Sequence, residues 1–525
     1  MKYIFLLISL FTFNFLQAQV TGVVKDAAGE PIPGANVFWM NTTNGVTTNE
    51  DGNFSIHKPA RSHMLVVSFI GFENDTIHVD KGNQQLDIVL REGVELSEVN
   101  VVTRKLGTMK LRTSVMNEDM ISSAELTRAA CCNLGESFVT NPSVDVSYSD
   151  AATGAKQIKL LGLSGTYVQM MTENIPNFRG AAAPYGLGYV PGPWMQSIQV
   201  SKGSSSVKNG YESITGQINV EFKKPQLPEA DWVSANLFAS STNRYEANAD
   251  ATVKLSKRWS TSLLAHYENE TKSHDSNDDG FVDIPRVEQY NVWNRWAYMG
   301  DHYVFQAGIK ALHETRNSGQ IAHGNTPSHD LYEIGIKTNR YEAFTKNAYI
   351  FDKEKNTNLA LILQGTLHNQ DANYGRKLYD VDQSNFYASL LFETELSKQH
   401  SLSAGLSFNY DGYDQNYRLT NQAEEGLTKK FVKESVPGAY VQYTFNLNDQ
   451  LMLMGGIRGD YSSEYGFFVT PRAHVKYNPN EYLHFRLSAG KGYRTNHVLA
   501  ENNYLLASSR KMKIASHLDQ EEAWN

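Results

Sequence analysis

The chain has very little cysteine, no excess of positive charge and, beyond its first residues, no long apolar run. Its two cysteines, Cys131 and Cys132, are adjacent, and neighbouring cysteines form at best a strained disulfide. Lysine and arginine number 48 against 56 aspartates and glutamates, a net charge of -8 that argues against a nucleic-acid partner. Because no later run reaches about 18 apolar residues, passage through a membrane would require a closed barrel of strands.

The first 18 residues have the features of a secretory signal. Lys2 precedes a mostly apolar run from Tyr3 to Leu16, which is too short to span a bilayer. The small residues that follow predict cleavage after Ala18. We therefore expect a signal peptide at 1–18 and an exported mature chain.

Aromatic residues are plentiful, with 28 tyrosines and 24 phenylalanines at a mean hydropathy of -0.43. This combination is typical of barrel walls that enclose a wet interior. From 401 to 410 (SLSAGLSFNY), apolar residues alternate with Ser, Gly and Asn, and 441–447, 473–477 and 483–489 repeat the pattern. One face of such a strand would meet lipid and the other would meet water.

The spacing of short polar turns separates a barrel from a soluble sandwich, which could show the same alternation. These turns recur near Lys257, Asp301, Glu354, Lys398, Asn448 and Asn480. The gaps of 44, 53, 44, 50 and 32 residues fit hairpins with tight turns on one side and long loops on the other. We predict an antiparallel transmembrane β-barrel over 230–525, with about thirteen strands.

Two glycine-rich segments precede this region, 158–180 (IKLLGLSGTYVQMMTENIPNFRG) and 198–222 (IQVSKGSSSVKNGYESITGQINVEF). They resemble the two signature segments of the plug in TonB-dependent outer-membrane receptors. The second matches the family at Val200, Lys202, Gly203, Ser206, Gly210, Gly216, Ile218, Asn219 and Val220. The family's Tyr-Gly pair is inverted here, as Gly210 then Tyr211. The resemblance implies an α+β plug over 104–226, and no Lys-Ser/Thr follows the glycines to make a phosphate loop.

Residues 20–91 contain short alternating strands separated by Asp, Gly and Pro turns, which predicts a small β-sandwich. They resemble the carboxypeptidase-regulatory-like domain through Gly22, Gly29, Pro31, Gly34, Ala35, Val37, Asp51, Gly52, Phe54 and Gly71. No Zn-binding His-Glu pair or nucleophile motif is present in this segment, so we interpret it as an accessory periplasmic module and not as an enzyme.

The segment 93–103 (GVELSEVNVVT) is extended and rich in valine. It is similar in kind to the TonB box, whose backbone pairs with an edge strand of the energising partner. The residues that would make this contact are Glu95, Leu96, Val99, Val101 and Val102. The alternative is the last strand of the sandwich, or a linker.

The segment 174–194 (NIPNFRGAAAPYGLGYVPGPW) lies between the two signature segments and is dense in Gly, Pro and aromatic residues. Aromatic side chains around one arginine suit a ligand contact, so the candidate ligand-binding residues are Arg179, Tyr185, Tyr189 and Trp194. The alternative is that the three aromatic residues only pack the plug against the barrel wall.

Two groups of residues are candidate metal ligands. Asp275, Asn277, Asp279 and Asp283 offer alternating oxygens around Gly280, which suits Ca²⁺, although Arg286 stands where a bidentate Glu would be. A solvated acidic loop is the alternative. The other candidates are soft ligands, Cys131, Cys132, Met170 and Met171, which would favour a transported soft metal such as copper. Their alternative is a buried pair of small residues with core methionines. No cofactor is required.

The resemblance implies an energy-coupled importer of the bacterial outer membrane, with its N-terminal domain in the periplasm. Its partners would be a TonB-type protein of the inner membrane, outer-membrane lipid and a small-molecule or metal-chelate ligand. By resemblance to 22-stranded barrels, we expect the chain to be a truncated piece. The alternatives are a passive barrel or adhesin, which needs no energy coupling, and an enzyme built on the front sandwich.

Overall fold

The computed structural model describes residues 19–26, 29–40, 45–49, 51–59, 63–69, 72, 75–79, 85–90, 108–110, 114–129, 132–139, 141–225, 232–321, 331–422, 426–447, 450–480, 483–515 and 518–525. The predicted signal peptide, the TonB-box-like segment and Cys131 lie outside these residues. The chain divides into two compact units, Met1–Lys105 and Leu106–Asn525. Within the described part, no helix is both long and apolar enough to cross a bilayer.

The first unit is a sandwich of two small sheets, with strand orders β4-β1-β7 and β3-β2-β5-β6. Its strands are β1 (Gln19–Lys25), β2 (Asn36–Trp39), β3 (Gly45–Thr47), β4 (Asn53–His57), β5 (Met64–Ser68), β6 (Asp75–His78) and β7 (Gln85–Val89). Alternate residues point into a shared core in which Trp39, Val20 and Leu65 are fully buried. The Trp39 indole donates to the carbonyl of His57 at 2.8 Å, so the largest core side chain also satisfies its polar atom.

The plug is built on a mixed sheet of order β13-β12-β15-β14-β9-β8. Its elements are β8 (Thr108–Lys110), β9 (Asn117–Ser122), α2 (Ser123–Arg128), η1 (Leu134–Phe138), β10 (Val144–Asp150), β11 (Ala155–Leu160), β12 (Val168–Thr172), β13 (Ile175–Pro176), β14 (Met195–Lys202) and β15 (Gly216–Phe222). Strand β12 runs parallel to β15, whereas β14 pairs antiparallel with both β15 and β9. The two signature segments therefore meet in the centre of one sheet.

The wall is a single sheet of fourteen strands in sequence order, with β16 and β29 at its edges. Its strands are β16 (Trp232–Ala239), β17 (Arg244–Lys254), β18 (Trp259–Glu270), β19 (Arg286–Met299), β20 (Tyr303–Gly319), β21 (Glu333–Asp352), β22 (Thr357–Tyr374), β23 (Lys377–Ser397), β24 (His400–Arg418), β25 (Thr428–Leu447), β26 (Leu451–Ser462), β27 (Gly466–Asn480), β28 (Leu483–Arg494) and β29 (Glu521–Trp524). Every neighbouring pair is antiparallel, which confirms the predicted fold class, and β29 adds a short fourteenth strand.

All six predicted polar turns fall between consecutive wall strands, at one end of the sheet. We call this end the short-turn end. At the opposite end, β16–β17, β22–β23 and β26–β27 are joined by short turns, and the last two use Gly375 and Gly466 at positive φ. The other connections at that end are longer, so the expectation of long loops throughout it was wrong at three connections. We name the opposite end the outer end, after bacterial outer-membrane barrels, in which the short turns are periplasmic.

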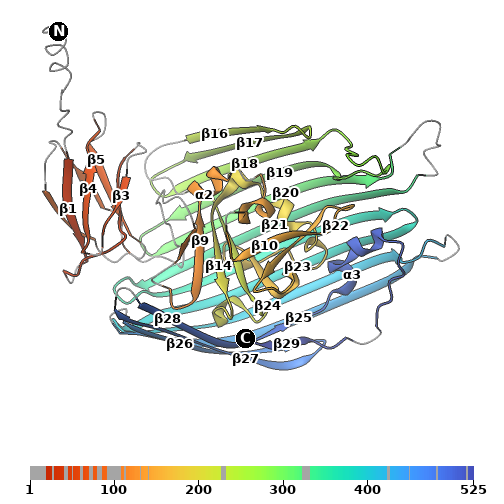
Figure 1. Cartoon of the computed structure of the whole chain (residues 1–525). Coiled ribbons are helices and arrows are strands. Elements are labelled where there is room, and N and C mark those ends of the chain that lie inside the picture. The colour runs from red at the N-terminus through yellow and green to blue at the C-terminus, as the bar shows by residue number, and fades with distance from the viewer. Residues whose placement is uncertain are drawn as a thin grey trace, which may run out of the picture. The chain divides into compact units, whose positions relative to one another are not determined.

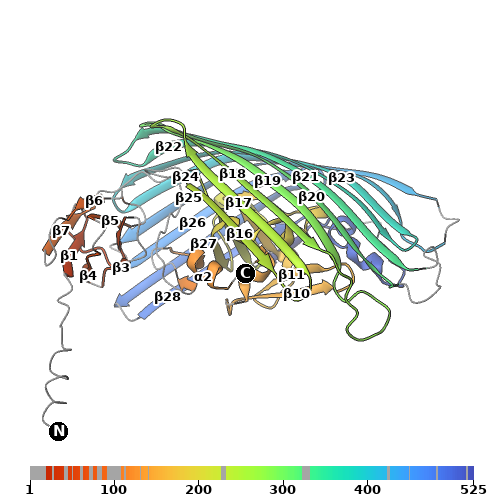
Figure 2. The ribbon, with the colours of Figure 1, turned by 90° about the horizontal axis from the view of Figure 1, so that it is seen from above.

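The alternating pattern of the wall separates an apolar outer face from a polar inner face. Leu406 is 58% exposed on the outside of β24, whereas Asn409 on the same strand is 7% exposed. Figure 1 shows the plug, orange to yellow, against the inner side of the curved green-to-blue sheet, and Figure 2 shows the same arrangement from above. Polar inner side chains are buried because they bond to the plug, as where Ser206 donates to the Gln442 side chain at 2.6 Å.

Candidate functional site

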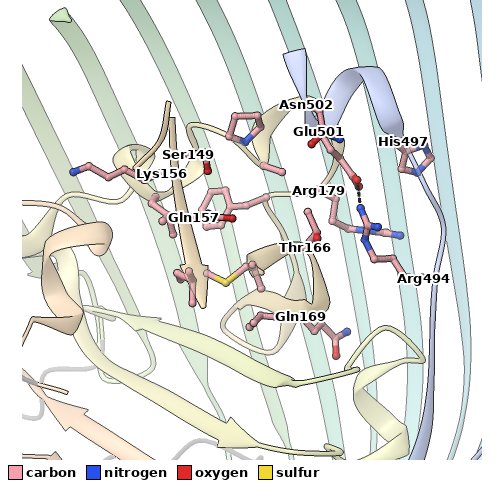
Figure 3. Close-up of a pocket in the computed structure, with 18 of the residues that line it drawn as sticks. Ser149, Lys156, Gln157, Thr166, Gln169, Arg179, Arg494, His497, Glu501 and Asn502 are labelled. Carbon is pink, nitrogen blue, oxygen red and sulfur yellow. Dashed lines mark hydrogen bonds and ion pairs between the residues drawn. The ribbon is translucent and has the colours of Figure 1, made fainter. Parts of the chain in front are cut away.

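A pocket opens at the outer end of the plug, between the plug and the connection that joins β28 to β29. We call it the ligand pocket. The space between its atoms is about 1020 Å³, a figure that includes open solvent. Plug residues on β11, β12 and the segment after β13 form one side, and residues 494–504 form the other (Figure 3). The pocket is thus shared by two parts of the chain that are far apart in sequence.

Arg179 is the central charged group on the plug side. Its guanidinium lies 2.5 Å from the Glu212 carboxylate and 3.2 Å from the Asp411 carboxylate of β24. Burial raises the pKa of Glu212 above its ordinary value, although the attraction of Arg179 opposes this shift. Gly180, which follows at φ 59°, lets the backbone approach the Tyr413 ring, where a Cβ would collide with the hydroxyl. Arg179 therefore joins the plug to the wall.

A second charged group lies on the opposite side of the pocket. Arg494, at the end of β28, pairs with Glu501 and lies 3.2 Å from Glu521. Burial raises the pKa of Glu501 to about 7, with Arg494 opposing the shift. Burial also lowers the pKa of His497 to about 4, so its ring is neutral at pH 7. Both guanidinium groups of the pocket are thus already matched by two carboxylates each.

The connection between β28 and β29 folds inward over the plug. It contains α3 (Val498–Glu501) and η8 (Asn503–Ala507). The Asn503 side chain is fully buried and accepts hydrogen bonds from the hydroxyls of Tyr185 at 3.2 Å and Tyr374 at 2.9 Å. One plug residue and one wall residue therefore fix the same amide.

A lysine of the wall holds the end of this connection. The Lys377 ammonium, on β23, donates to the carbonyls of Leu506 at 3.2 Å, Ser508 at 2.5 Å and Arg510 at 3.1 Å. These bonds satisfy carbonyls that no helix partner can reach at the end of η8. The inward position of the connection is thus stabilised by Lys377 of the wall as well as by Tyr185 of the plug.

Two polar atoms at the pocket have no hydrogen-bond partner. Gln169 donates through its amide nitrogen to the Asn209 carbonyl at 2.6 Å, but its Oε1 is unpaired and the residue is only 4% exposed. The Nε2 atom of His497 is also buried without a partner. Unpaired buried polar atoms cost free energy, so both atoms are places where a ligand or water would bind favourably.

The predicted ligand residues separate into two groups. Arg179 lines the ligand pocket. Tyr189 and Trp194 are fully buried against the wall, where Trp194 packs on Trp293 with ring centroids 6.3 Å apart. Tyr185 is buried too, and its ring lies under the Arg316 guanidinium at 5.1 Å. For these aromatic residues the geometry corresponds to the packing alternative.

Sequence reasoning did not single out Glu212, Arg494 or Glu501, although all three line the ligand pocket. Each is an ordinary charged residue in its own segment. Only the fold brings them to Arg179, so no local spacing could have indicated them.

The four candidate Ca²⁺ ligands do not line the ligand pocket. In the described residues, no group of three or more His, Cys, Asp or Glu side chains is placed to hold a metal ion. The Asp275 carboxylate accepts backbone hydrogen bonds from Asp279 at 3.1 Å and Gly280 at 2.9 Å, which is a turn network. Asp283 likewise accepts from the Ser276 amide at 2.7 Å.

The soft candidates are spread over the plug. Met170 lines the ligand pocket and Met171 is fully buried. Cys132 is buried beside Arg244 and Glu246, and its burial raises the pKa of its thiol. The Ca²⁺ and soft-metal sites both stay predictions.

Three family models match the chain. The model described as "TonB dependent receptor-like, beta-barrel" matches residues 196–525, the plug-domain model matches 110–217, and the CarboxypepD_reg-like model matches 20–102. The chain belongs to the TonB-dependent receptor family. Members of this family are receptors and not enzymes, and their barrel indicates an outer-membrane protein.

Several curated relatives match part of the chain. The TonB-dependent receptor SusC of Bacteroides thetaiotaomicron is 28% identical over 245 residues, which cover 44% of this chain and 24% of SusC. The TonB-dependent receptor P39 of Formosa agariphila is 39% identical over 100 residues, 18% of this chain and 10% of P39. The matched region thus spans about a quarter or less of these relatives.

Solved structures share the fold. The alcaligin outer-membrane receptor FauA of Bordetella pertussis has a TM-score of 0.60 at 14% identity, and the match covers 77% of this chain and 69% of FauA. The copper transporter OprC has a TM-score of 0.60 at 11% identity, covering 74% of this chain and 64% of OprC. At these identities the likeness concerns the fold alone.

Proposed function

We propose that this TonB-dependent receptor imports a small-molecule ligand through the outer membrane, with energy supplied by a TonB-type partner. The observation that carries the proposal is that the ligand pocket lies at the outer end, between the plug and an inward-folded connection of the wall. A ligand bound there contacts both parts at once. Its binding energy can therefore favour one arrangement of the plug over another.

The partner contact is assigned to residues 93–103, through Glu95, Leu96, Val99, Val101 and Val102. A valine-rich segment suits strand addition, in which its backbone would pair with a partner's edge strand. Four residues separate this segment from the start of β8, an edge strand of the plug sheet. A pull on it would therefore act first on the plug and not on the wall.

For the ligand we propose a metal or a metal chelate. Support comes from the fold neighbours, whose names include a receptor for alcaligin and a copper transporter. In this chain, Met170 and the neutral ring of His497 line the same pocket and are ligand types that copper accepts. An organic chelate would in addition find acceptor atoms at Gln169 and His497.

Deletion of 94–102 tests the energy coupling. Uptake of a bound ligand by cells is expected to fall to the level seen with a protonophore, while surface binding stays unchanged. A matched control replaces the segment by a Gly/Ser stretch of equal length, which keeps the spacing but removes the side chains. Unchanged uptake after deletion would defeat active import and favour the passive barrel.

The ligand class is tested by growth and uptake across a panel of copper, zinc, nickel and ferric citrate. The parent is compared with Cys131→Ser, Cys132→Ser and Met170→Leu. Loss of uptake of one metal in a variant that still reaches the outer membrane would identify a soft-metal route. Equal uptake of every metal by cells with and without the receptor would contradict the metal proposal.

A further inference from the structure

A second pocket lies beside the ligand pocket, between the plug and the outer ends of β17, β18, β19 and β20. We call it the acidic pocket. About 590 Å³ of space lies between its atoms, open solvent included. Lys156, Pro184 and Leu187 of the plug line both pockets, and the Lys156 amide donates to the Pro184 carbonyl at 3.1 Å. These plug residues therefore form the boundary between the two spaces.

The wall side of the acidic pocket belongs to a row of acceptor side chains on four neighbouring strands. Glu246 of β17 pairs in register with Glu268 of β18, which pairs with Gln289 of β19. Gln289 in turn pairs with Glu314 of β20. All four side chains are buried, and the last three line the pocket. Cross-strand neighbours lie close together, so carboxylates in such a row repel one another unless cations lie between them.

One arginine is shared by three carboxylates at this row. The Arg244 guanidinium lies 2.6 Å from Glu246, 3.0 Å from Glu268 and 3.0 Å from Glu136 of the plug. A single positive charge cannot neutralise all three. Glu270 is the cross-strand partner of Arg244 in the register of β17 and β18, but the guanidinium is directed to the other carboxylates.

Glu270 is consequently left without an ion pair. Its side chain lines the acidic pocket and is 7% exposed, and no cation of the described ranges forms an ion pair with it. The other two cations of the lining are engaged elsewhere. Arg316 lies 3.0 Å from Glu314, and the Lys156 ammonium lies 5.2 Å from the centre of the Tyr148 ring.

Negative charge therefore exceeds positive charge around the acidic pocket. The five glutamates named above stand against Lys156, Arg244 and Arg316. His266, 3.8 Å from Glu268, would add a fourth positive charge only when protonated, and the excess would remain. The wall connection 271–285, whose last two residues border the pocket, adds four aspartates and one lysine. Such a surrounding raises the local concentration of cations.

Gln289 gives a second, independent indication of a ligand. It is 1% exposed and lines the pocket. Its amide nitrogen donates to the Glu314 carboxylate at 2.8 Å and to the Gly188 carbonyl at 3.2 Å. Because both partners are acceptors, the orientation of the amide is fixed, and its Oε1 is left without a hydrogen-bond partner among the described residues. A buried unpaired acceptor costs free energy that a donor would recover.

Glu270 and the Gln289 oxygen can be satisfied by one group. Gln289 is the cross-strand partner of Glu268, which lies two residues before Glu270 on β18, so both side chains point to the same face as diagonal neighbours. The described carboxylates are not placed to coordinate a metal ion directly. A protonated amine or guanidinium fits instead, because it carries one positive charge together with several N–H donors.

We propose that the acidic pocket binds an organic cation through an ammonium or guanidinium group, with Glu270 and the Gln289 oxygen as its acceptors. Glu268 and Glu314 complete the acidic lining. The site is separate from the ligand pocket, and binding there needs no energy coupling.

Equilibrium binding to the purified full receptor in detergent tests the site. The probe is n-butylguanidinium, and the comparison is n-butylurea, which has nearly the same shape but no charge. Calorimetric titration is expected to show saturable binding of butylguanidinium, about tenfold or more tighter than that of butylurea. Glu270→Gln should weaken butylguanidinium binding about tenfold, because it removes the charge and keeps the shape. Equal binding of the two compounds by the parent, or binding of neither, would overturn the proposal.

Glu434→Gln is the matched control. Glu434 is also a buried, inward-facing glutamate of the wall, but it accepts hydrogen bonds from Ser462 at 2.5 Å and Thr495 at 3.2 Å and does not line the acidic pocket. This variant should bind butylguanidinium as the parent does. An equal loss in both variants, or unchanged binding in Glu270→Gln, would overturn the assignment of the site.

A second pair of variants locates the site without changing its carboxylates. Ile284 borders the acidic pocket, whereas Leu505 lies in the β28–β29 connection, and both are exposed, at 41% and 48%. Ile284→Arg brings a competing guanidinium to the rim and should weaken butylguanidinium binding several-fold, while Leu505→Arg should leave it unchanged. The reverse order would overturn the proposal. Because these measurements need no energised membrane, their failure would leave the import proposal standing, and unchanged uptake after deletion of 94–102 would leave this site standing.

Discussion

The Arg295 guanidinium of strand β19 lies 2.6 Å from the Glu173 carboxylate, which sits between β12 and β13 of the plug. Both side chains are almost fully buried. Lys346 of β21 adds a second cation at 3.6 Å and donates to the Glu173 carbonyl at 2.9 Å. This cluster connects the β12–β13 turn, at one edge of the plug sheet, to two wall strands.

Glu173→Gln is expected to loosen the plug from the wall. Removing one member of a buried ion pair typically costs about 3–5 kcal/mol, because the remaining charge stays buried without a partner. Denaturant unfolding, monitored by hydrogen exchange of the β12 and β15 amides, would measure the loss of unfolding free energy. The exposed turn residue Glu354 offers a matched control, since Glu354→Gln should change stability by less than about 0.5 kcal/mol.

The same carboxylate predicts sensitivity to acid. Arg295 and Lys346 outweigh the effect of burial and hold the pKa of Glu173 below its ordinary value. A lowered pKa contributes stability above the unfolded value near 4.3 that is lost as the pH falls toward the folded value. Exchange of plug amides should therefore accelerate below pH 4 in the parent. If Glu173→Gln showed the same acid transition, another group would be responsible.

The raised pKa of Glu501 leads us to expect the opposite pH dependence for the stability of the β28–β29 connection. Its folded pKa of about 7 lies above the unfolded value, so the native state binds the extra proton between these two values. The stability of this segment should fall as the pH rises from 4.5 through 7, by at most about 3 kcal/mol. Amide exchange of 498–501 at pH 5.5 and 8.0, corrected for intrinsic rates, measures it.

The Glu501→Gln variant should lose this pH dependence, and Glu464→Gln in an exposed turn of the wall should keep it. A parent whose connection becomes more protected at high pH would contradict the prediction. The comparison of the two variants separates the effect of the Arg494–Glu501 pair from that of other charged residues near the ligand pocket.

Gly180→Ala is expected to disturb the ligand pocket. Gly180 adopts φ 59°, and an added Cβ would meet the hydroxyl of Tyr413, so both backbone strain and a steric clash oppose the change. The cost should be about 1–3 kcal/mol from the backbone alone. The loss of stability is measured as increased protease sensitivity of the plug. Gly162→Ala is the control, because Gly162 also has a positive φ but has open space around it.

A single charged residue on the outer face of the wall is expected to destabilise the barrel. Leu406 projects outward midway along β24, at 58% exposure. Leu406→Arg should cost about 2–4 kcal/mol of folding free energy in lipid vesicles. Leu406→Ala is the matched control, and an equal effect of both substitutions would mean that this position does not face the hydrocarbon.

Sequence reasoning reached the strand pattern of the wall and all six short turns, because period-two alternation and polar turn residues are local signals. It did not foresee the tight turns at Gly375 and Gly466, because short turns and long loops have similar polar compositions. It reached Arg179 through its aromatic surroundings. It missed Glu212, Arg494 and Glu501, because ion pairs between distant segments leave no local trace.

The parallel pairing of β12 with β15 also constrains how the chain assembles. Parallel strands need a long crossover, and here the whole Gly- and Pro-rich segment between Thr172 and Met195, followed by β14, must be positioned first. Such contacts between remote residues slow folding and leave strand edges exposed to aggregation meanwhile. All of this segment precedes β16 in the chain, so every strand of the plug sheet is present before the first wall strand begins.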